Sequence, residues 1–293
     1  MPEGAFTVNL PDGRRLEGWA SGESGQPAVL LHVGTPSAGT PFAPLVDAAR
    51  ARGIGFVTYS RPGYAGSTRL EGRSVADCAR DVAALLDARS LERATMVGWS
   101  GGGPHALACA ALLPGRVSAA ATLAGVAPWD AEGLAWLEGM AEENLEEFAA
   151  AVEGEDALLR FLEPIVAGRV DVTADSLAAG LGGLLTDVDR AAFTGELAEF
   201  LAETNRAAIS AGPWGWLDDD LAFARDWGFE LAEIGVPVTI WHGRQDAMVP
   251  TAHGEWLAQH IPGARRRILD DEGHLSLVLR FDAILDDLHA NVA

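Results

Sequence analysis

The chain contains no lysine, so all 21 of its positively charged residues are arginines. This absence excludes Schiff-base catalysis by lysine and phosphate-binding loops that depend on a lysine. Positive charge is scarce overall, because 42 acidic residues bring the net charge to −21. Such an acidic protein repels nucleic acids and anionic membranes. We therefore expect a small-molecule substrate and no nucleic-acid partner.

Cysteines and long hydrophobic runs are scarce as well. Cys78 and Cys109 lack the spacing of a metal site, and we expect two buried, reduced thiols, with no metal and no cofactor. No apolar stretch approaches the roughly 20 residues of a membrane span, and the first residues lack the pattern of a signal peptide. The sequence predicts a cytoplasmic monomer or homodimer that does not bind membranes.

What the chain does contain is a regular alternation of strand-like and helix-like segments. Short apolar runs predict buried strands, and the Asp12-Gly13 turn predicts a hairpin between the first two. The eight predicted strands are 5–10, 15–20, 28–33, 55–59, 95–97, 117–123, 236–241 and 265–269. The predicted helices are 42–52, a segment with Ser74 as N-cap, 104–113, 251–261 and 275–289. This alternation predicts an α/β protein with a mostly parallel sheet and helices on both faces.

The alternation stops between residues 130 and 226, where the chain shows only helical periodicity. We therefore divide the chain into a core domain, residues 1–129 and 227–293, and a helical cap, residues 130–226, inserted over one end of the sheet. Charge runs in such helices usually face solvent. The acidic residues expected on this solvated face include Glu142, Glu143, Glu146 and Glu147.

The segment from Thr95 to Pro104 predicts a strand, a sharp turn and a helix. Gly98-Trp99-Ser100-Gly101-Gly102 matches the Gly-x-Ser-x-Gly pattern of a nucleophile elbow. Such a turn holds the serine in a strained backbone conformation, and its glycines provide clearance that side chains would remove. The hydroxyl is placed above the sheet, at a helix N-terminus whose free N–H groups can bind an anion. Ser100 is therefore our candidate nucleophile.

A serine hydroxyl needs a base to take its proton, and that base is usually a histidine oriented by a carboxylate. Among the seven histidines, His274 follows the last predicted strand, at the end of the sheet where α/β proteins bind ligands. Asp246 is placed in the same way, just after the predicted strand that ends at Trp241. The candidate triad is Ser100, Asp246 and His274.

Three other carboxylates are alternatives to Asp246 as the orienting acid. Asp130 follows the sixth predicted strand, whereas Asp270 and Asp271 lie close to the histidine in the sequence. We expect the last two to cap the loop or to be solvated. Asp246, which follows a strand end as the serine and the histidine do, remains the first choice, and Asp130 stays open as the acid that follows the earlier strand.

With these motifs the chain resembles the α/β-hydrolase-fold serine hydrolases, close to the proline iminopeptidase-like and esterase branch with a helical cap. The resemblance extends over essentially the whole chain and includes the order serine, acid, histidine. It implies an eight-stranded, mostly parallel sheet with an inserted all-helical cap. It also implies that Ser100 is the nucleophile, His274 the general base and acid, and Asp246 its orienting carboxylate. The segments that carry it are Gly34-Thr35-Pro36, 61–67, the Ser100 elbow, 242–246 and Gly273-His274.

The resemblance further implies an oxyanion hole made of two backbone N–H groups. One belongs to Gly101, the residue after the nucleophile, and the other to the loop after the third predicted strand. That loop usually contains His-Gly-x-Pro in the family, whereas here Val33 precedes Gly34. Aligning the glycine and the proline places the second donor at Thr35, with Gly34 as the alternative.

The elbow residues also narrow the chemistry that the resemblance implies. True proline iminopeptidases have Gly-Gly-Ser-Trp-Gly there, so the order Gly-Trp-Ser-Gly-Gly argues against that peptidase activity. A serine at position 100 argues against haloalkane dehalogenases and epoxide hydrolases, which use aspartate at this point.

We therefore predict a serine hydrolase that cleaves a small, mostly apolar carboxylic ester, or a lactone, thioester or amide, through an acyl-enzyme. A carbon–carbon bond hydrolase with the same triad is the first alternative. A non-catalytic small-molecule binder on this fold is the second, although a binder has no need of Asp246. The acidic cap is expected to disfavour anionic substrates. The predicted substrate contacts are Trp99, Trp129, His242 and Trp214.

Overall fold

One eight-stranded sheet organises the computed structural model, which describes residues 3–23 and 25–292. The strand order is β1-β2-β4-β3-β5-β6-β7-β8. The β1–β2 and β2–β4 pairs are antiparallel and the other pairs are parallel, which confirms the predicted fold. The strands are β1 (Gly4–Asn9), β2 (Arg15–Ala20), β3 (Ala28–His32), β4 (Gly55–Tyr59), β5 (Ala94–Trp99), β6 (Val117–Leu123), β7 (Val238–Gly243) and β8 (Arg265–Leu269).

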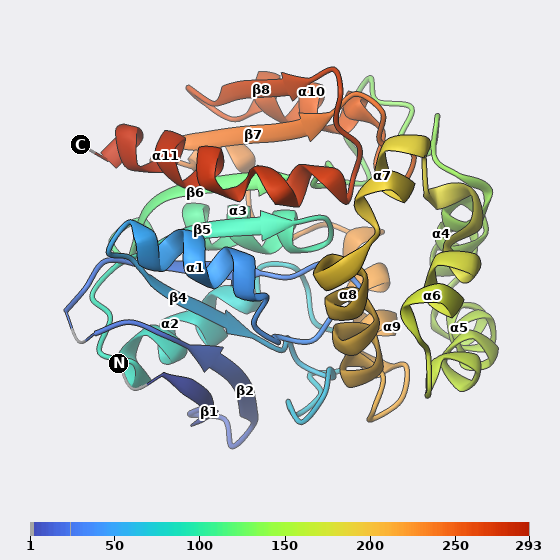
Figure 1. Ribbon diagram of the computed structural model, residues 1–293, viewed down its shortest axis with the longest axis horizontal. Helices are drawn as coiled ribbons and strands as arrows, with labels where there is room; N and C mark the ends of the chain where they lie inside the picture. The colour runs from blue at the N-terminus through green and yellow to red at the C-terminus, as the bar shows by residue number, and fades with distance from the viewer. Residues whose placement is uncertain (1–2, 24, 293) are drawn as a thin grey trace.

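Helices cover both faces of this sheet (Figure 1). On one face lie α1 (Ala43–Ala51) and α11 (Phe281–Val292). On the other lie α2 (Cys78–Ala88), α3 (Gly102–Leu112) and α10 (Thr251–His260). Strands β3, β4 and β7 are buried along their whole length because both of their faces are covered. Two apolar cores result, one between the sheet and each helical layer.

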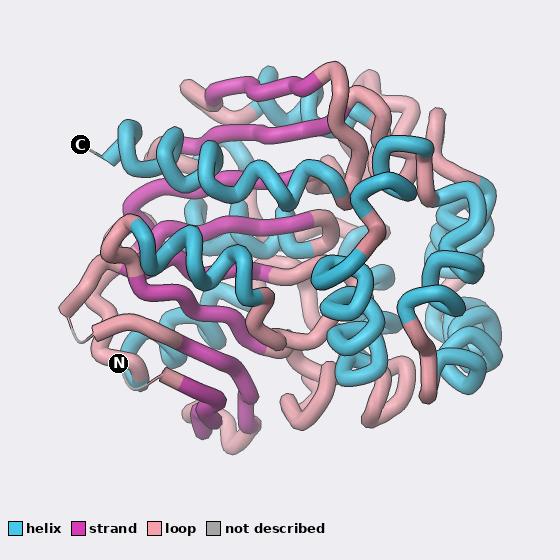
Figure 2. The backbone as a smooth tube through the Cα atoms, viewed as in Figure 1, coloured by secondary structure: helices cyan, strands magenta, loops and turns pink. Residues whose placement is uncertain are grey.

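The described residues between β6 and β7 form helices and loops, and Figure 2 shows no strand in this part of the chain. We call α4–α9 the inserted helices. They gather beyond the carboxyl ends of the parallel strands, toward which the arrows of β5 and β7 point in Figure 1. All six lie within the segment predicted as a cap; the division into two domains stays a prediction. Their bounds are α4 (Glu142–Glu153), α5 (Glu155–Arg169), α6 (Ala174–Leu181), α7 (Asp187–Ala192), α8 (Gly195–Ala208) and α9 (Trp214–Phe223), with 3-10 turns η1 (Gly182–Leu184) and η2 (Leu231–Glu233).

The clearest differences from the predicted helix boundaries are at α2 and at the last helix. Helix α2 begins at Cys78 and not directly after Ser74, because Asp77 Oδ2 accepts hydrogen bonds from Ser74 N (2.8 Å) and Ser74 Oγ (3.0 Å) and closes a turn there. The last predicted helix is divided into a 3-10 turn, η3 (Ser276–Arg280), and α11.

The two cysteines lie together between α2 and α3. Cys78 and Cys109 are free and buried, with their sulfur atoms 3.9 Å apart. None of the described helices combines the length and the apolar character that crossing a membrane requires.

Candidate active site

Ser100 lies in the turn between β5 and α3. Its backbone φ is +53°, in the left-handed region that non-glycine residues rarely adopt. A Cβ atom on Gly98 would overlap the carbonyl oxygen of Gly102, and a Cβ atom on Gly102 would overlap the carbonyl oxygen of His32. The two glycines therefore permit the close packing that the sequence pattern suggested. Ser100 N donates to Leu123 O over 2.8 Å, which fixes the turn to β6.

His274 and Asp246 form a buried pair beside this turn. The two atoms His274 Nδ1 and Asp246 Oδ2 are 2.8 Å apart. The other carboxylate oxygen accepts hydrogen bonds from Met248 N (2.9 Å) and Val249 N (2.8 Å). His274 Nε2 is therefore the ring nitrogen left to exchange a proton with a substrate or nucleophile. The alternative acids are all exposed, namely Asp130, Asp270 and Asp271.

Burial and attraction act in opposite directions on the pKa values of this pair. Burial raises the pKa of Asp246, but the charge of His274 and hydrogen bonds from His242 and His274 outweigh it and bring that pKa below its usual value. Burial lowers the pKa of His274, but the charge and hydrogen bond of Asp246 raise it above the ordinary 6.5. Asp246 is therefore a carboxylate that stabilises a protonated His274.

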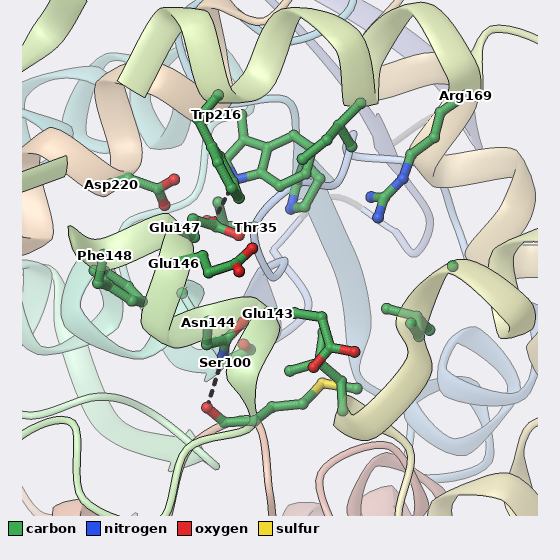
Figure 3. Close-up of a pocket in the computed structure, with 18 of the residues that line it drawn as sticks. Thr35, Ser100, Glu143, Asn144, Glu146, Glu147, Phe148, Arg169, Trp216 and Asp220 are labelled. Atoms are coloured by element: carbon green, nitrogen blue, oxygen red, sulfur yellow. Dashed lines mark hydrogen bonds between the residues drawn. The ribbon is translucent and has the colours of Figure 1, made fainter. Parts of the chain in front are cut away.

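Ser100 faces a cavity enclosed by the inserted helices (Figure 3). The cavity has a volume of about 790 Å³ and is also lined by Gly101 and Thr35. A smaller cavity of about 100 Å³ shares Ser100 and Thr35 with it and is lined by His274. The volume of the larger cavity is in the range found for small-molecule binding sites. Its apolar walls include Val126, Phe148, Phe161, Ile165, Leu184 and Phe223.

One of the four predicted substrate contacts lies at this site. Trp99 lines the smaller cavity, and its indole Nε1 donates to the carbonyl oxygen of His274 over 3.2 Å. The tryptophan therefore packs beside the histidine loop at the floor of the site.

The other three predicted contacts do not line either cavity in the described part of the chain. Trp129 packs on Trp136, with ring centroids 4.8 Å apart. Trp214 lies under the guanidinium of Arg69, 4.6 Å from its ring centre. His242 is fully buried, with Nε2 2.7 Å from the carbonyl oxygen of Val249. In each case the side chain contacts a neighbouring group and not the cavity. Helical periodicity in the sequence does not report such contacts. The aromatic residues that line the larger cavity are Phe148, Phe161, Trp216 and Phe223.

A buried carboxylate of α9 holds the loop that carries the predicted oxyanion donors. Asp219, fully buried, accepts hydrogen bonds from Thr35 Oγ1 (2.7 Å), Arg61 Nη2 (2.6 Å) and Tyr64 Oη (2.8 Å). Arg61 also donates to the carbonyl oxygen of Gly34 over 2.9 Å. Burial raises the pKa of Asp219, but the nearby arginines outweigh it and lower that pKa below its usual value. The loop is therefore fixed by an ion pair from which water is excluded.

Gly101 and Thr35 lie side by side, because a Cβ atom on Gly101 would overlap Thr35 Oγ1. Among the hydrogen bonds of residues 3–23 and 25–292, none has the backbone N–H of Gly101 or Thr35 as its donor. A Cβ atom on Gly34 would be 3.4 Å from Ser100 Cβ, so this loop borders the nucleophile directly. Two free N–H groups next to Ser100 suit a developing negative charge on oxygen.

A second carboxylate from the inserted helices holds the histidine loop. Asp189 of α7 is fully buried and accepts hydrogen bonds from the N–H groups of His274 (2.8 Å), Leu275 (2.8 Å) and Ser276 (2.9 Å). These N–H groups lie at the start of η3, where a negative charge is favourable. Sequence reasoning missed both Asp189 and Asp219. The available signal for Asp219 was a run of three aspartates inside an apolar helix.

The acidic residues of α4 are not all solvated as expected. Glu147 is half-buried and its Oε1 accepts a hydrogen bond from Trp216 Nε1 over 2.7 Å. Glu143 Oε1 accepts one from Gly183 N over 2.8 Å. Both line the larger cavity, together with Asp220. Glu142 and Glu146 are exposed as expected, whereas Glu143 and Glu147 are turned toward the cavity, and periodicity alone does not distinguish a cavity from solvent. No cluster of three or more metal-ligand side chains occurs among the described residues.

Comparison with known proteins agrees with this geometry. The model of a family described as alpha/beta hydrolase fold matches residues 27–159. This match covers slightly less than half of the chain; together with the sheet topology it shows the predicted α/β-hydrolase fold, and the prediction of an enzyme is confirmed. A pimeloyl-(acyl-carrier protein) methyl ester esterase from Aromatoleum aromaticum is 29% identical, over 91% of this chain and 92% of its own.

Two further proteins show how far the similarity extends. A 2-hydroxy-6-oxononadienedioate/2-hydroxy-6-oxononatrienedioate hydrolase from Pseudomonas putida is 26% identical, over 86% of this chain and 82% of its own. The crystal structure of the enol-lactonase from Burkholderia xenovorans LB400 matches with a TM-score of 0.70, over 97% of this chain and 100% of that one, at 20% identity. The last similarity concerns the fold alone.

Proposed function

We propose that this protein is a serine hydrolase that cleaves a small, mostly apolar carboxylic ester, or a lactone, thioester or amide, through an acyl-enzyme. One observation carries the proposal. The strained Ser100 and a His274 whose Nδ1 is held by Asp246 line the same cavity. The esterase of Aromatoleum aromaticum, similar over almost the whole chain, supports an ester as the substrate.

In the proposed reaction, Ser100 Oγ attacks the carbonyl carbon while His274 Nε2 takes its proton. The carbonyl oxygen becomes an oxyanion and accepts hydrogen bonds from the N–H groups of Gly101 and Thr35. When the intermediate collapses, the bond to the alcohol breaks, His274 gives its proton to the alcohol oxygen, and the acyl group stays on Ser100. Water then attacks the acyl-enzyme and loses a proton to His274. When this second intermediate collapses, the bond to Ser100 Oγ breaks, His274 returns the proton to that oxygen, and the acid is released.

A carbon–carbon bond hydrolase is the second candidate, because the relative from Pseudomonas putida is named as a hydrolase of a 2-hydroxy-6-oxo dienedioate. The same triad would serve that chemistry, with a carbanion as the leaving group in place of an alkoxide. The larger cavity favours the ester, since its walls are mostly apolar and acidic and thus poorly suited to a substrate with two carboxylates.

The test is covalent labelling followed by hydrolysis. We expect a fluorophosphonate probe to label the wild type at Ser100 and to leave Ser100→Ala unlabelled. With p-nitrophenyl esters of graded acyl length, Ser100→Ala should lower kcat by on the order of 10⁴ to 10⁶, as loss of the nucleophile does in triad enzymes. Thermal stability should stay close to that of the wild type, because one hydroxyl is lost and the backbone turn is kept. Turnover of the alanine variant near the wild-type rate would contradict the mechanism.

A further inference from the structure

Three consecutive aspartates of α9 are all buried, but only two of them have a cationic partner. Asp218 pairs with Arg69, whose Nε lies 2.9 Å from Oδ2, and Asp219 pairs with Arg61. Asp220 is 1% exposed and has no ion pair with any arginine or histidine of the described residues. A buried carboxylate without a cation is costly, so Asp220 calls for a separate explanation.

The neighbour of Asp220 is another carboxyl group, that of Glu147 in α4. Burial, together with this like-charged neighbour, raises the pKa of Asp220 well above its usual value. Burial also raises the pKa of Glu147, although Trp216 Nε1 donates to it. In the described part of the chain no donor reaches Asp220 Oδ2. The two carboxyl groups can therefore relieve their repulsion only by sharing a proton or by receiving a cation from outside.

Both carboxyl groups face the cavity that contains Ser100. In Figure 3, Glu147 and Asp220 lie next to each other beside Trp216, and Arg169 stands apart from them. Arg169 lies over the Trp216 ring, 5.3 Å from its centre. It attracts Glu147 electrostatically, yet no ion pair within 4.0 Å joins the two in the described structure.

We propose that Glu147 and Asp220 form a subsite for a primary ammonium group carried by the substrate, at a distance from the bond that Ser100 cleaves. The inference rests on the proposed hydrolase function and specifies its substrate class: an apolar ester with a terminal amine. An ammonium group has three N–H donors, which can serve Asp220 Oδ2 and Glu147 at once.

The chemistry of the cavity favours a cation over the other occupants. Four acidic side chains line it (Glu143, Glu146, Glu147 and Asp220) against two arginines (Arg160 and Arg169). A carboxylate would be repelled by this excess of negative charge. Aromatic walls such as Phe148 and Trp216 accommodate both an alkyl chain and a cation placed over a ring.

The experiment compares substrates of matched shape. p-Nitrophenyl hexanoate, its 6-amino derivative and the corresponding adipate monoester differ only at the end of the acyl chain. A second pair, hexyl butyrate and 6-aminohexyl butyrate, places the ammonium group on the alcohol side. We expect the wild type to prefer the ammonium ester over the neutral ester at least tenfold in kcat/KM, in one of the two series. Equal values in both series would overturn the inference. A preference for the adipate monoester would also overturn it and would point to an arginine of the cavity, such as Arg169, as the stronger anchor.

The variants separate the effect of the Glu147–Asp220 pair from that of the general negative charge of the cavity. Asp220→Asn and Glu147→Gln should each bring the ratio of ammonium to neutral ester close to one. Glu146→Gln is the matched control, since Glu146 lies on the same helix and lines the same cavity but is exposed. It should retain the ratio. Circular dichroism and melting temperatures check that each variant is folded, and the ratio is measured within one variant, so loss of total activity does not affect it.

A binding measurement keeps the inference separate from the proposed function. Titration calorimetry with hexylammonium needs no turnover, and we expect saturable binding to the wild type that Asp220→Asn abolishes and Glu146→Gln retains. Hexylammonium binding without hydrolysis of any ester would contradict the proposed function and leave the subsite intact. Hydrolysis of the neutral ester without any hexylammonium binding would contradict the subsite and leave the proposed function intact.

Discussion

At the scale of single residues, the pair of Asp246 and His274 sets the pH dependence expected of the enzyme. The folded protein raises the pKa of His274 above 6.5. Protonated His274 cannot accept the proton of Ser100, so kcat/KM for p-nitrophenyl butyrate should fall as the pH is lowered through that raised pKa and be full above it. A profile that is flat from about pH 5 to 8 would argue against a histidine base.

The control for this pH profile is Asp246→Asn. The amide carries no negative charge, so the pKa of His274 should move downward and the acid limb of the profile with it. The rate in the plateau should drop by roughly 10⁴-fold, because the imidazole loses both its orientation and its charge stabilisation. If the acid limb of the profile did not move in Asp246→Asn, a group other than His274 would control the loss of activity at low pH.

The side chain of Thr35 offers a second test at this scale, because it connects the predicted oxyanion loop to Asp219. Thr35→Val keeps the backbone N–H and removes the hydroxyl, so we expect kcat to fall roughly tenfold with little change in KM, since the loop matters most when the oxyanion forms. The matched control is Thr40→Val. The hydroxyl of Thr40 is buried, without a partner in the described structure. That variant should therefore keep its kcat. A similar loss of kcat in both variants would contradict the role of the Thr35 hydroxyl.

Local patterns in the sequence select candidate site residues that follow strand ends, and they miss residues that act across long distances in the chain. Ser100, Asp246 and His274 each lie in the loop that follows a strand, so local patterns suffice to select them as candidates. The contact between Thr35 and Asp219 joins residues 184 positions apart, and that between His274 and Asp189 joins residues 85 apart. No periodicity reports such a contact, because it depends on how the inserted helices pack.

At the scale of elements, we expect two neighbouring aspartates of α9 to contribute differently to the free energy of unfolding. Asp219→Asn leaves Arg61, 1% exposed, without a full counter-charge and should lower the free energy of unfolding by about 3 to 5 kcal/mol. Asp218→Asn should have a clearly smaller effect, because the side chain of Arg69 is 24% exposed and can be hydrated. Urea denaturation of both variants measures the difference, and equal losses would show that exposure of the arginine does not matter.

Helix α4 shows why an element can be predicted correctly and its role misjudged. The apolar face was visible in the sequence, and the opposite acidic face was expected to be solvated. Glu143 and Glu147 instead face a cavity formed with α9 and η1. The amphipathic pattern of a helix shows which face is apolar and which is polar. It does not show whether the polar face lines a cavity or meets solvent, because both surroundings favour the same residues.

At the scale of the whole molecule, the inserted helices belong to the framework of the site as well as enclosing it. Asp219 of α9 holds the loop of Thr35, and Asp189 of α7 holds the loop of His274. Both carboxylates are fully buried. A large displacement of these helices would expose or unpair both charges, so substrate entry that leaves α7 and α9 in place is energetically favoured.

The net charge of −21 adds a long-range effect to the short-range chemistry of the cavity. Such a field slows the approach of anions and speeds that of cations, and salt screens it, with a Debye length of about 30 Å at 0.01 M and about 10 Å at 0.1 M. Raising the ionic strength should therefore increase kcat/KM for the adipate monoester, lower it for the 6-aminohexanoate ester and leave the hexanoate ester unchanged. The buried contact with Glu147 and Asp220 is screened much less, so the ammonium ester should remain the preferred substrate at high salt. If kcat/KM for the adipate monoester instead falls as salt is added, a local positive charge, and not the net charge of the molecule, governs entry to the site.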